Sequence, residues 1–452
     1  MIINAPAGEI NATTINAPTG RTATYVVCAS DSVNKAQCDY VCDGVADDVE
    51  IQAAIDAAGL RGVVLLSEGH YVINHSLTLD SGVSLRGASR WNTIINCSPD
   101  MSDAPWSAPI IYAYQETGME ISHLMLDSNY LNLNLSDHHG SKRTIWLEKS
   151  SNISLHDLTI YRGYGPTIAL VRSSMVDAYN ILIADSNYSS FLIYGGDDVP
   201  SHTITLNSII VKLDDPGGYV TLQPTLSIDG ASFNDTYDII VTDFTSDYGN
   251  LLVRKARNVQ INNYLSVNNM GDHTITNSAD VRVNGFSAVG KIKDCGLSVT
   301  YSSDIHLNGI DIHASEYGPS PPGGACGISI DHDNRNIFLN GIKVIMPSDG
   351  ENALRILDGS TAVISNGLLN GSISYDLRVD ATSYAAISGL VYSNSSISDE
   401  THLFDQRHLY TSLPNMTYEL LADAGSNQPI IYVNATAHYL ICLLYTSPSP
   451  RD

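Results

Sequence analysis

The chain has 452 residues and a formal net charge of −25, and 43% of its residues are hydrophobic while only 16% are charged. That apolar fraction can bury a large core, which excludes intrinsic disorder, and the apolar runs are too short to cross a membrane. The acidic balance repels phosphate and disfavours nucleic acid as a partner. The 25 Tyr and 34 Gly far outnumber the 6 Phe. Tyr suits strands and Gly suits bends, so we expect an all-β protein.

The N-terminal region is expected to contain an arm followed by a cap. Residues 1–24 repeat short Ile-Asn-Ala phrases and predict a flexible arm or linker. Residues 25–82 predict a capping region with one helix over 47–58. Asp47 is the expected N-cap, and Glu50 three residues later completes a capping box. An apolar stripe supports this helix, and it consists of Ile51, Ala54, Ile55 and Ala58.

One phrase then recurs through residues 83–398: an apolar-x-apolar triplet, Asn-Gly or a similar pair, and another apolar residue. Copies begin at Val83, Met119, Ile153, Ile181, Ile204, Ile239, Val259, Val281, Ile305, Ile337, Val363 and Ala385. Asn-Gly between apolar runs is usually a hairpin signal. A phase that returns about every 20–36 residues instead indicates a solenoid. We expect a parallel β-helix of about twelve coils, with Asn and Gly at left-handed bends.

The two ends of the chain are treated separately. We expect residues 399–441 to form a separate C-terminal segment. Residues 442–452 look like translated sequencing-adaptor read-through, and we leave them out of the fold prediction. No secretory signal opens the chain, because Asn, Pro and Glu follow Met1-Ile2-Ile3 almost at once. This favours a fragment, or a protein that leaves the cell as part of a virion.

The seven cysteines do not follow a zinc-binding pattern, and we predict no metal site from them. Buried thiols are the favoured interpretation. Cys295-Gly296-Leu297 and Cys326-Gly327-Ile328 begin the same phrase in consecutive coils. We therefore expect Cys295 and Cys326 to be stacked neighbours about 4.8 Å apart, and two reduced thiols are favoured over a disulfide bond.

The N-terminal block resembles the pectate-lyase superfamily, in its rhamnogalacturonase/epimerase-like branch, and is also similar to viral tailspike β-helices. The resemblance is carried by Asp43-Gly44-Val45-Ala46-Asp47-Asp48, the helix, Gly62-Val63-Val64-Leu65-Leu66 and Ser81-Gly82-Val83-Ser84-Leu85-Arg86-Gly87. It implies a right-handed parallel β-helix capped by the helix. It is not specific for an activity, because the superfamily holds hydrolases, lyases, epimerases and non-catalytic adhesins. Gly196-Asp197-Asp198 resembles one polygalacturonase element. The other elements of that family, Asn-Thr-Asp, Gly-His-Gly and Arg-Ile-Lys, are missing.

Long inserts share one phase and predict where a binding site lies. Residues 97–109, 127–143, 212–225, 313–326 and 346–353 each fall between the last strand of one coil and the first strand of the next. They should form a wall beside those first strands, whose outward residues would floor a groove. That outward row is Trp146, Glu148, Leu192, Tyr194, Ser227, Asp229, Leu252, Arg254, Ser298, Ser329, Asp331, Arg355 and Arg378.

An acidic cluster stands out from this row. Its expected catalytic members are Asp197, Asp198, Asp229 and Arg254, with Tyr194, Asp214 and Asp215 beside them. Two carboxylates about 5–9.5 Å apart can act as acid and base or nucleophile on a glycosidic bond. The same oxygens can instead hold Ca²⁺ against a uronate. An acidic turn cluster without chemistry is the alternative interpretation.

A second group surrounds the longest insert. Asp127, His138, His139 and Arg143 lie in or beside it, and Tyr161 and Arg162 follow one coil later. We take Asp127, His139 and Arg162 as candidate substrate-binding residues, together with Trp146 and Glu148. A solvated lid is the other interpretation of this loop.

These features favour a carbohydrate-active β-helix that binds and cleaves a polysaccharide, located extracellularly or on a virion surface. Hydrolase and lyase both remain open, and so does a non-catalytic glycan-binding adhesin or tail fibre. No cofactor is required, and Ca²⁺ enters only for a lyase. The expected partner is a polysaccharide substrate or glycan receptor. Nucleic acid and membrane are not expected partners, and a homotrimer is one arrangement that the sequence allows.

Overall fold

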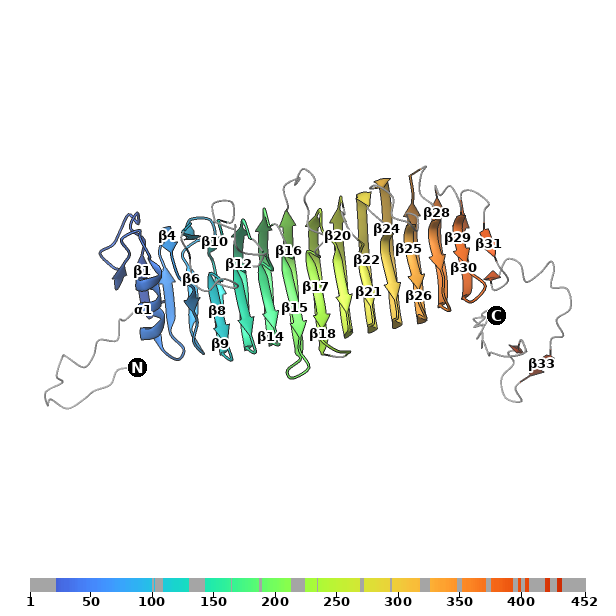
Figure 1. Ribbon diagram of the computed structural model, residues 1–452, viewed down its shortest axis with the longest axis horizontal. Coiled ribbons are helices and arrows are strands. Elements are labelled where there is room, and N and C mark those ends of the chain that lie inside the picture. The colour runs from blue at the N-terminus through green and yellow to red at the C-terminus, as the bar shows by residue number, and fades with distance from the viewer. Residues whose placement is uncertain are drawn as a thin grey trace, which may run out of the picture. The chain divides into compact units, whose positions relative to one another are not determined.

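The computed structural model describes residues 22–99, 101, 109–129, 143–163, 165–186, 189–212, 224–233, 235–268, 272–292, 295–317, 326–347, 352–370, 375–392, 397–399, 403–405, 419–422 and 429–432. Two stacked parallel sheets run along the chain (Figure 1). The first, sheet A, has 19 strands. They are β1 (Tyr25–Cys28), β2 (Tyr40–Val41), β3 (Val63–Leu66), β4 (Gly69–Ile73), β6 (Ser84–Gly87), β7 (Thr93–Cys97), β9 (Thr117–Ser122), β10 (Met125–Asp127), β12 (Ser151–Tyr161), β14 (Ser174–Ala184), β16 (Ser201–Lys212), β18 (Thr236–Asp247), β20 (Ala256–Val267), β22 (Ala279–Ile292), β24 (Ser303–Tyr317), β26 (Arg335–Ile345), β28 (Thr361–Asn370), β30 (Tyr384–Tyr392) and β32 (Leu403–Asp405).

The second sheet, sheet B, has 13 shorter strands, and from β11 to β32 they alternate with those of sheet A along the chain. They are β5 (Leu77–Thr78), β8 (Ile111–Tyr114), β11 (Ile145–Glu148), β13 (Ile168–Val171), β15 (Phe191–Gly195), β17 (Leu226–Gly230), β19 (Leu251–Arg254), β21 (Thr274–Thr276), β23 (Cys295–Thr300), β25 (Cys326–Asp331), β27 (Asn352–Ile356), β29 (Tyr375–Val379) and β31 (Ile397–Asp399). From β11 onward each coil therefore passes once through each sheet, and the predicted right-handed parallel β-helix is confirmed.

Alternation along the strands builds the core. In β11, Ile145 and Leu147 are fully buried, whereas Trp146 and Glu148 between and after them are half-buried. The same inward rows continue in register through neighbouring strands, so one continuous apolar column fills the interior. Two copies of the repeat were misplaced. Val176 and Ala362 occupy the inward position that we assigned to Ile181 and Val363, and Val363 points outward and is 45% exposed.

The bends within the long strands of sheet A are left-handed, as the Asn-Gly phrases predict. Gly309 and Gly341 have φ of 64° and 65°, and Asn308 pairs with Asn340 in parallel register. The hairpin reading is therefore excluded. Equivalent positive-φ positions run the length of the sheet, and they are His123, Asp157, Asn180, Ser208, Asp243, Asn263, Gly285, Gly309, Gly341, Asn366 and Gly389. We call this series the bend ladder.

The helix α1 (Asp48–Ala58) packs against β1 to β5 and covers the N-terminal end of the core. Its Ile51, Ala54 and Ile55 are fully buried, as predicted. The predicted capping box is wrong, because Asp47 makes no side-chain bond to its own helix. Its carboxylate instead accepts hydrogen bonds from the backbone N–H groups of Gly44 and Val72, both at 2.8 Å. Asp47 therefore ties the helix start to β4.

Two disulfide bonds replace the reduced thiols that the sequence favoured. Cys295 and Cys326 are register partners with their Cα atoms 4.5 Å apart, which confirms the predicted stacking but not the predicted redox state. Cys28 and Cys38 form the other bond. Neighbouring in-register strands bring the Cβ atoms of two stacked cysteines close enough for their sulfur atoms to form a disulfide bond.

Replacing both Cys295 and Cys326 by serine is expected to lower the free energy of unfolding by about 3–4 kcal/mol, because the bond closes a loop of 31 residues in the unfolded chain. Chemical denaturation with and without a reducing agent measures this. A reductant should destabilise the wild type and leave the double variant unchanged. Equal stabilities of the two proteins under oxidising conditions would contradict the assignment.

An aromatic stack lies inside the middle coils. Phe244, Tyr264 and Phe286 are register partners with ring centroids 5.4 and 5.5 Å apart and nearly parallel planes. His273 meets the edge of this stack and is fully buried. Its Nδ1 accepts a hydrogen bond from the backbone N–H of Leu251 at 2.9 Å. Burial lowers the pKa of His273 to about 3, so the ring is neutral.

A neutral buried His273 makes the fold sensitive to acid. The unfolded chain binds this proton near the ordinary histidine pKa and the folded chain does not, so stability is complete above that pKa and falls as pH decreases toward about 3. We expect a loss of about 2–3 kcal/mol between about pH 6 and 4 from this group alone. In His273→Asn, which keeps an acceptor for Leu251, the pH dependence of unfolding should be flatter by that amount. If the unfolding free energies of wild type and variant changed equally with pH, this role of His273 would be contradicted.

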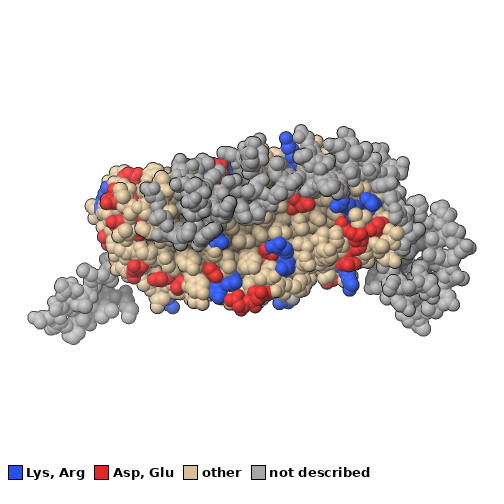
Figure 2. Space-filling view, in the orientation of Figure 1, with Lys and Arg blue, Asp and Glu red and all other residues tan. Residues whose placement is uncertain are grey.

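The chain divides into two compact units, residues 1–403 and 404–452. In the second unit, β33 (Glu419–Ala422) and β34 (Pro429–Tyr432) form an antiparallel pair. Among the described residues, no helix combines the length and apolarity needed to cross a membrane. On the face shown in Figure 2, acidic and basic side chains adjoin in small groups on a mostly uncharged surface.

Candidate functional site

The ends of the sheet B strands present one outward row of side chains. Parallel register places Tyr114, Glu148, Val171, Tyr194, Asp229, Arg254, Thr276, Thr300 and Asp331 next to one another in consecutive coils. We call this series the edge row, and at the strand spacing it extends about 38 Å. The inserts lead into these strands, since each leaves a sheet A strand and enters a sheet B strand, as predicted. The edge row is therefore the natural place for an extended ligand.

Aromatic side chains gather at the N-terminal part of this face. Tyr112 is the register partner of Trp146, and Tyr114 is the partner of Glu148. Tyr114 is 41% exposed. The guanidinium of Arg143 lies over the Trp146 ring, and burial lowers the pKa of Arg143 to about 10. Rings with an apolar face and a polar edge are suited to stacking on sugars.

Charged side chains next to these rings form a continuous ion-paired group. Arg172 contacts Glu148 at 3.6 Å and Asp198 at 3.1 Å, and Lys149 contacts Asp198 at 3.0 Å. The hydrogen bond from Lys149 and the charge of Arg172 lower the pKa of Asp198. Lys149 and Arg172 occupy left-handed corner positions with φ of 52° and 54°, directly after β11 and β13. Sequence reasoning missed both cations because their corner positions lie outside the alternating strand pattern.

Asp229 and Arg254 are register partners and form a bidentate pair. Arg254 donates from Nε at 2.8 Å and from an Nη atom at 2.5 Å to the two carboxylate oxygens. We expected Asp229 to face solvent, and this is wrong: the residue is only 5% exposed. Every residue of β17 is buried, although the register partners of Asp229 in the two neighbouring coils, Tyr194 and Arg254, are partly exposed. The charge of the buried Asp229 carboxylate is therefore balanced by the guanidinium of Arg254.

Asp229→Asn is consequently expected to cost stability of about 1–2 kcal/mol, because Arg254 keeps its charge and loses its partner. Denaturation of the variant measures the loss. Asp280→Asn is the matched control, since the Asp280–Arg282 pair is exposed on both sides and its removal should change little. Equal effects of the two substitutions would show that the Asp229 pair behaves as a surface pair.

The three predicted catalytic aspartates engage different partners. Asp197 accepts from the Ser232 hydroxyl, Asp198 is held by cations of preceding coils, and Asp229 is held by the following coil. Among the contacts of the described residues, none joins these carboxylates to one another. Their joint catalytic role therefore remains a prediction.

The second predicted group is only partly described. Asp127 and Arg162 form a bidentate ion pair at the ends of β10 and β12, where the long insert leaves sheet A. Asp127 is 6% exposed, so the pair fixes this corner. Tyr161, the register partner of Asp127, is exposed. His138, His139, Asp214 and Asp215 lie outside the described residues.

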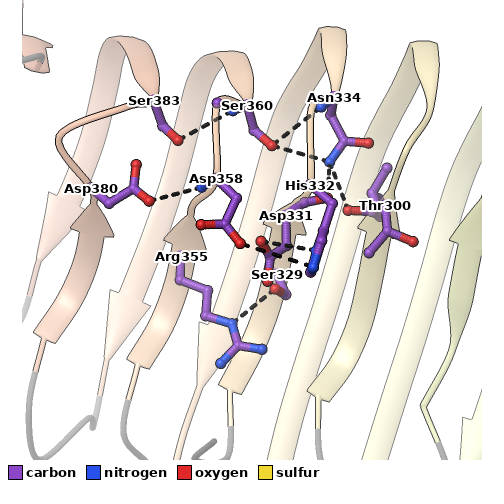
Figure 3. A network of polar contacts seen from close by, with 12 residues as sticks. Thr300, Ser329, Asp331, His332, Asn334, Arg355, Asp358, Ser360, Asp380 and Ser383 are labelled. Carbon is purple, nitrogen blue, oxygen red and sulfur yellow. Dashed lines mark hydrogen bonds and ion pairs between the residues drawn. The ribbon is translucent and has the colours of Figure 1, made fainter.

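A carboxyl pair lies at the C-terminal part of the edge row (Figure 3). Asp331 ends β25, and Asp358 follows β27 in the next coil. His332 contacts both carboxyl groups, with Nδ1 3.1 Å from Asp331 and Nε2 3.9 Å from Asp358. One donor atom of each of the three side chains lies within 4.8 Å of those of the other two. The two carboxyl groups are thus close enough to act on the same bond.

The two carboxyl groups have different surroundings. The Asp331 side chain is 15% exposed and that of Asp358 is 64% exposed. Burial raises the pKa of Asp331, and the neighbouring Asp358 adds to the increase, while His332 and Arg355 oppose it. The backbone N–H of Asp358 donates to Asp380 at 2.8 Å, which fixes the corner that carries Asp358. A half-buried acid next to an exposed carboxylate is an arrangement suited to acid–base chemistry.

Arg355 lies beside the carboxyl pair on the outer face of sheet B. Its Nε donates to the Ser329 hydroxyl at 2.8 Å, and Figure 3 shows its guanidinium directed away from the bend. The sequence placed Ser329, Asp331 and Arg355 in the outward row but did not identify Asp358 or His332. The signal for Asp358 was its Asp358-Gly359 bend phrase, one coil after Asp331.

The comparisons with known proteins agree with the fold. No protein-family model matches the chain, and no curated protein matches it. Solved structures that resemble it include the pre-mature gene product 12 of bacteriophage phi29, with 15% identity, a TM-score of 0.56, and coverage of 77% of this chain and 51% of that one. The chain thus spans about half of the phage protein.

Two further similar structures have lower scores. The A-module of a mannuronan C-5 epimerase from Azotobacter vinelandii has 14% identity and a TM-score of 0.45, with coverage of 78% and 97%. PfbA, a surface adhesin of Streptococcus pneumoniae, has 13% identity and a TM-score of 0.42, with coverage of 87% and 96%. At these identities the resemblance concerns the fold alone.

Proposed function

We propose that the protein binds a polysaccharide along the edge row and hydrolyses a glycosidic bond between Asp331 and Asp358. The observation that carries this proposal is the carboxyl pair itself: an oxygen of the half-buried Asp331, whose pKa is raised, lies within 4.8 Å of an oxygen of the exposed Asp358. Glycosidases work with one protonated and one ionised carboxyl group on either side of the bond. This replaces Asp197, Asp198 and Asp229 as the preferred catalytic set.

Of the two hydrolytic routes we propose the one with retention of configuration, because one oxygen of Asp331 and one of Asp358 lie within 4.8 Å, which is closer than an inverting pair that admits a water. Asp331 donates its proton to the leaving oxygen, while Asp358 attacks the anomeric carbon and forms a glycosyl ester. Water, deprotonated by Asp331, then cleaves this ester and restores both groups. Retaining enzymes have carboxyl groups about 5–5.5 Å apart, whereas inverting enzymes need about 6.5–9.5 Å to admit a water.

Other residues in or beside the edge row are assigned to substrate binding. Tyr114, Trp146 and Tyr194 offer rings for stacking on sugar units. Arg254 and Arg355 offer guanidinium groups to carboxylate or sulfate substituents. Glu148 and Asp198, both ion-paired, offer oxygens to sugar hydroxyl groups. Asp127 and Arg162, which we expected to bind substrate, are instead assigned to joining the ends of β10 and β12.

A non-catalytic glycan-binding protein is the second candidate function. The observation that favours it is that Glu148, Asp198 and Asp229 each have a cationic partner, which suits a binding surface better than a catalytic one. The resemblance to a phage protein supports a virion or extracellular location for either function. Partners other than a polysaccharide or glycan receptor are not proposed, and a homotrimer remains one arrangement for the rod.

Incubation with a panel of neutral and acidic polysaccharides tests the proposal. New reducing ends without absorbance from unsaturated uronates are expected, and a chelator should leave the rate unchanged. Unsaturated products that require Ca²⁺ would indicate a lyase. Binding of a polysaccharide without any cleavage would establish the second candidate function and contradict the first.

A further inference from the structure

A second polar cluster, on the outer face of sheet A, is independent of the edge row. It is centred on His156 in β12 and includes His123, Asp157 and Glu120 from the same two coils. Side-chain nitrogens of His123 and His156 and a carboxylate oxygen of Asp157 lie within 4.8 Å of one another. We propose that His123, His156 and Asp157 bind a divalent transition-metal ion, with Zn²⁺ as the test ion.

The distances agree with a tetrahedral site. His156 Nδ1 lies 2.8 Å from Asp157 Oδ2, and His123 Nε2 lies 3.6 Å from the same oxygen. Ligands about 2.0–2.2 Å from Zn²⁺ in tetrahedral geometry are about 3.3 Å apart. The two distances lie on either side of that value. Small side-chain adjustments therefore place all three donors on one ion.

The groups around these donors hold them in the orientation that a metal requires. Glu120 lies 3.2 Å from His156 Nε2, and Glu120 is itself bound by Arg86 at 2.5 Å and by the Ser122 hydroxyl at 2.9 Å. A carboxylate that accepts the Nε2 proton leaves Nδ1 as the ligand atom, as in carboxylate–histidine–metal arrangements. The His156 ring also stacks flat on Tyr179, with centroids 4.8 Å apart.

Asp157 is supported in the same way. Its Oδ1 accepts a hydrogen bond from Asn180, whose side-chain oxygen in turn accepts one from Arg90 at 2.9 Å. This leaves Oδ2 directed at the two histidines. His123 is 47% exposed, so water or an oxygen-donating ligand can occupy the remaining coordination position. The ion would bridge two consecutive coils.

The bend ladder supplies a further argument. His123 and Asp157 occupy ladder positions that hold Asn, Asp, Ser or Gly in every later described coil. These residues are sufficient for the left-handed bend. A histidine at this position, beside a second histidine, is therefore not required by the fold. Departures from a local structural rule are expected at functional sites.

Calorimetric titration of the full chain with ZnCl₂, and the shift of its thermal transition with Zn²⁺, test this proposal. His123→Asn introduces the residue that the ladder carries as Asn180 and Asn263, so the metal-free variant should melt like the wild type. Its affinity for Zn²⁺ at this site should fall at least about 100-fold, and that of Glu120→Gln about 10–100-fold. His202→Asn, which removes a histidine stacked on Tyr237 in the same sheet, should bind like the wild type.

Co²⁺ provides a readout that a purely structural role would not change. The wild type should give the strong visible absorption of four-coordinate Co²⁺, and His123→Asn should lose it. The proposal is overturned if Zn²⁺ does not stabilise the wild type, or if His123→Asn binds Zn²⁺ with the same affinity and stoichiometry.

Discussion

Asp331→Asn is expected to lower the rate of polysaccharide cleavage by about 10²–10⁴-fold, the usual contribution of a general acid. Asparagine has the shape of the protonated carboxyl group but cannot give up a proton to the leaving oxygen. Burial already raises the pKa of Asp331 and favours the neutral form, so the substitution should leave the thermal transition nearly unchanged. Initial rates of reducing-end release measure the effect.

The pH dependence adds a second readout for Asp331. Because its pKa is raised, activity should persist above the range in which an ordinary aspartate has lost its proton, and should fall as Asp331 ionises at higher pH. Asp311→Asn is the matched control. It removes an exposed pair with Lys343 on sheet A and should alter neither rate nor profile. An active Asp331→Asn protein would remove Asp331 from the catalytic pair.

Phe286→Ala is expected to lower the free energy of unfolding by about 3–5 kcal/mol. The ring is 1% exposed and is stacked on Tyr264, with His273 against its edge at 4.9 Å. Removing it leaves a cavity that rigid neighbouring coils cannot close, because each strand is fixed by hydrogen bonds on both sides. Chemical denaturation measures the loss.

Phe338→Ala provides the comparison for Phe286. Phe338 also stacks on an aromatic partner, His306, at 4.7 Å, but it lies on the outer surface and is 38% exposed. Its removal should cost less than about 1 kcal/mol. Similar losses for the two variants would contradict the assignment of inward and outward faces in sheet A.

The sequence was sufficient to predict the coils and their register wherever the repeated phrase can be aligned in only one way. Apolar triplets define the inward face, and Asn-Gly marks the bend, because glycine and asparagine adopt a positive φ at the lowest cost. The identical phrases at Cys295 and Cys326 therefore predicted their pairing correctly. Alignment failed where the triplet was weak, as at Val176, whose inward neighbour is the small Ala178.

The candidate site was less predictable, because alternation defines a direction but not a degree of burial. Asp229 points outward, as predicted, yet it is buried and paired with Arg254. Asp358 and His332 occupy a corner, where residues follow no period. The histidine cluster on sheet A joins His123 and His156, which are 33 positions apart. Their proximity cannot be inferred from the sequence unless the register of the two coils is known.

The configuration of the first cleavage product tests the central claim most directly. Proton NMR of the anomeric signals, recorded early in the hydrolysis of the polysaccharide that the panel identifies, distinguishes the two outcomes. A carboxyl pair within 4.8 Å predicts a product that first appears with the configuration of the substrate. A product that first appears inverted, or unchanged cleavage by Asp331→Asn, would contradict the assignment of Asp331 and Asp358 as the catalytic pair.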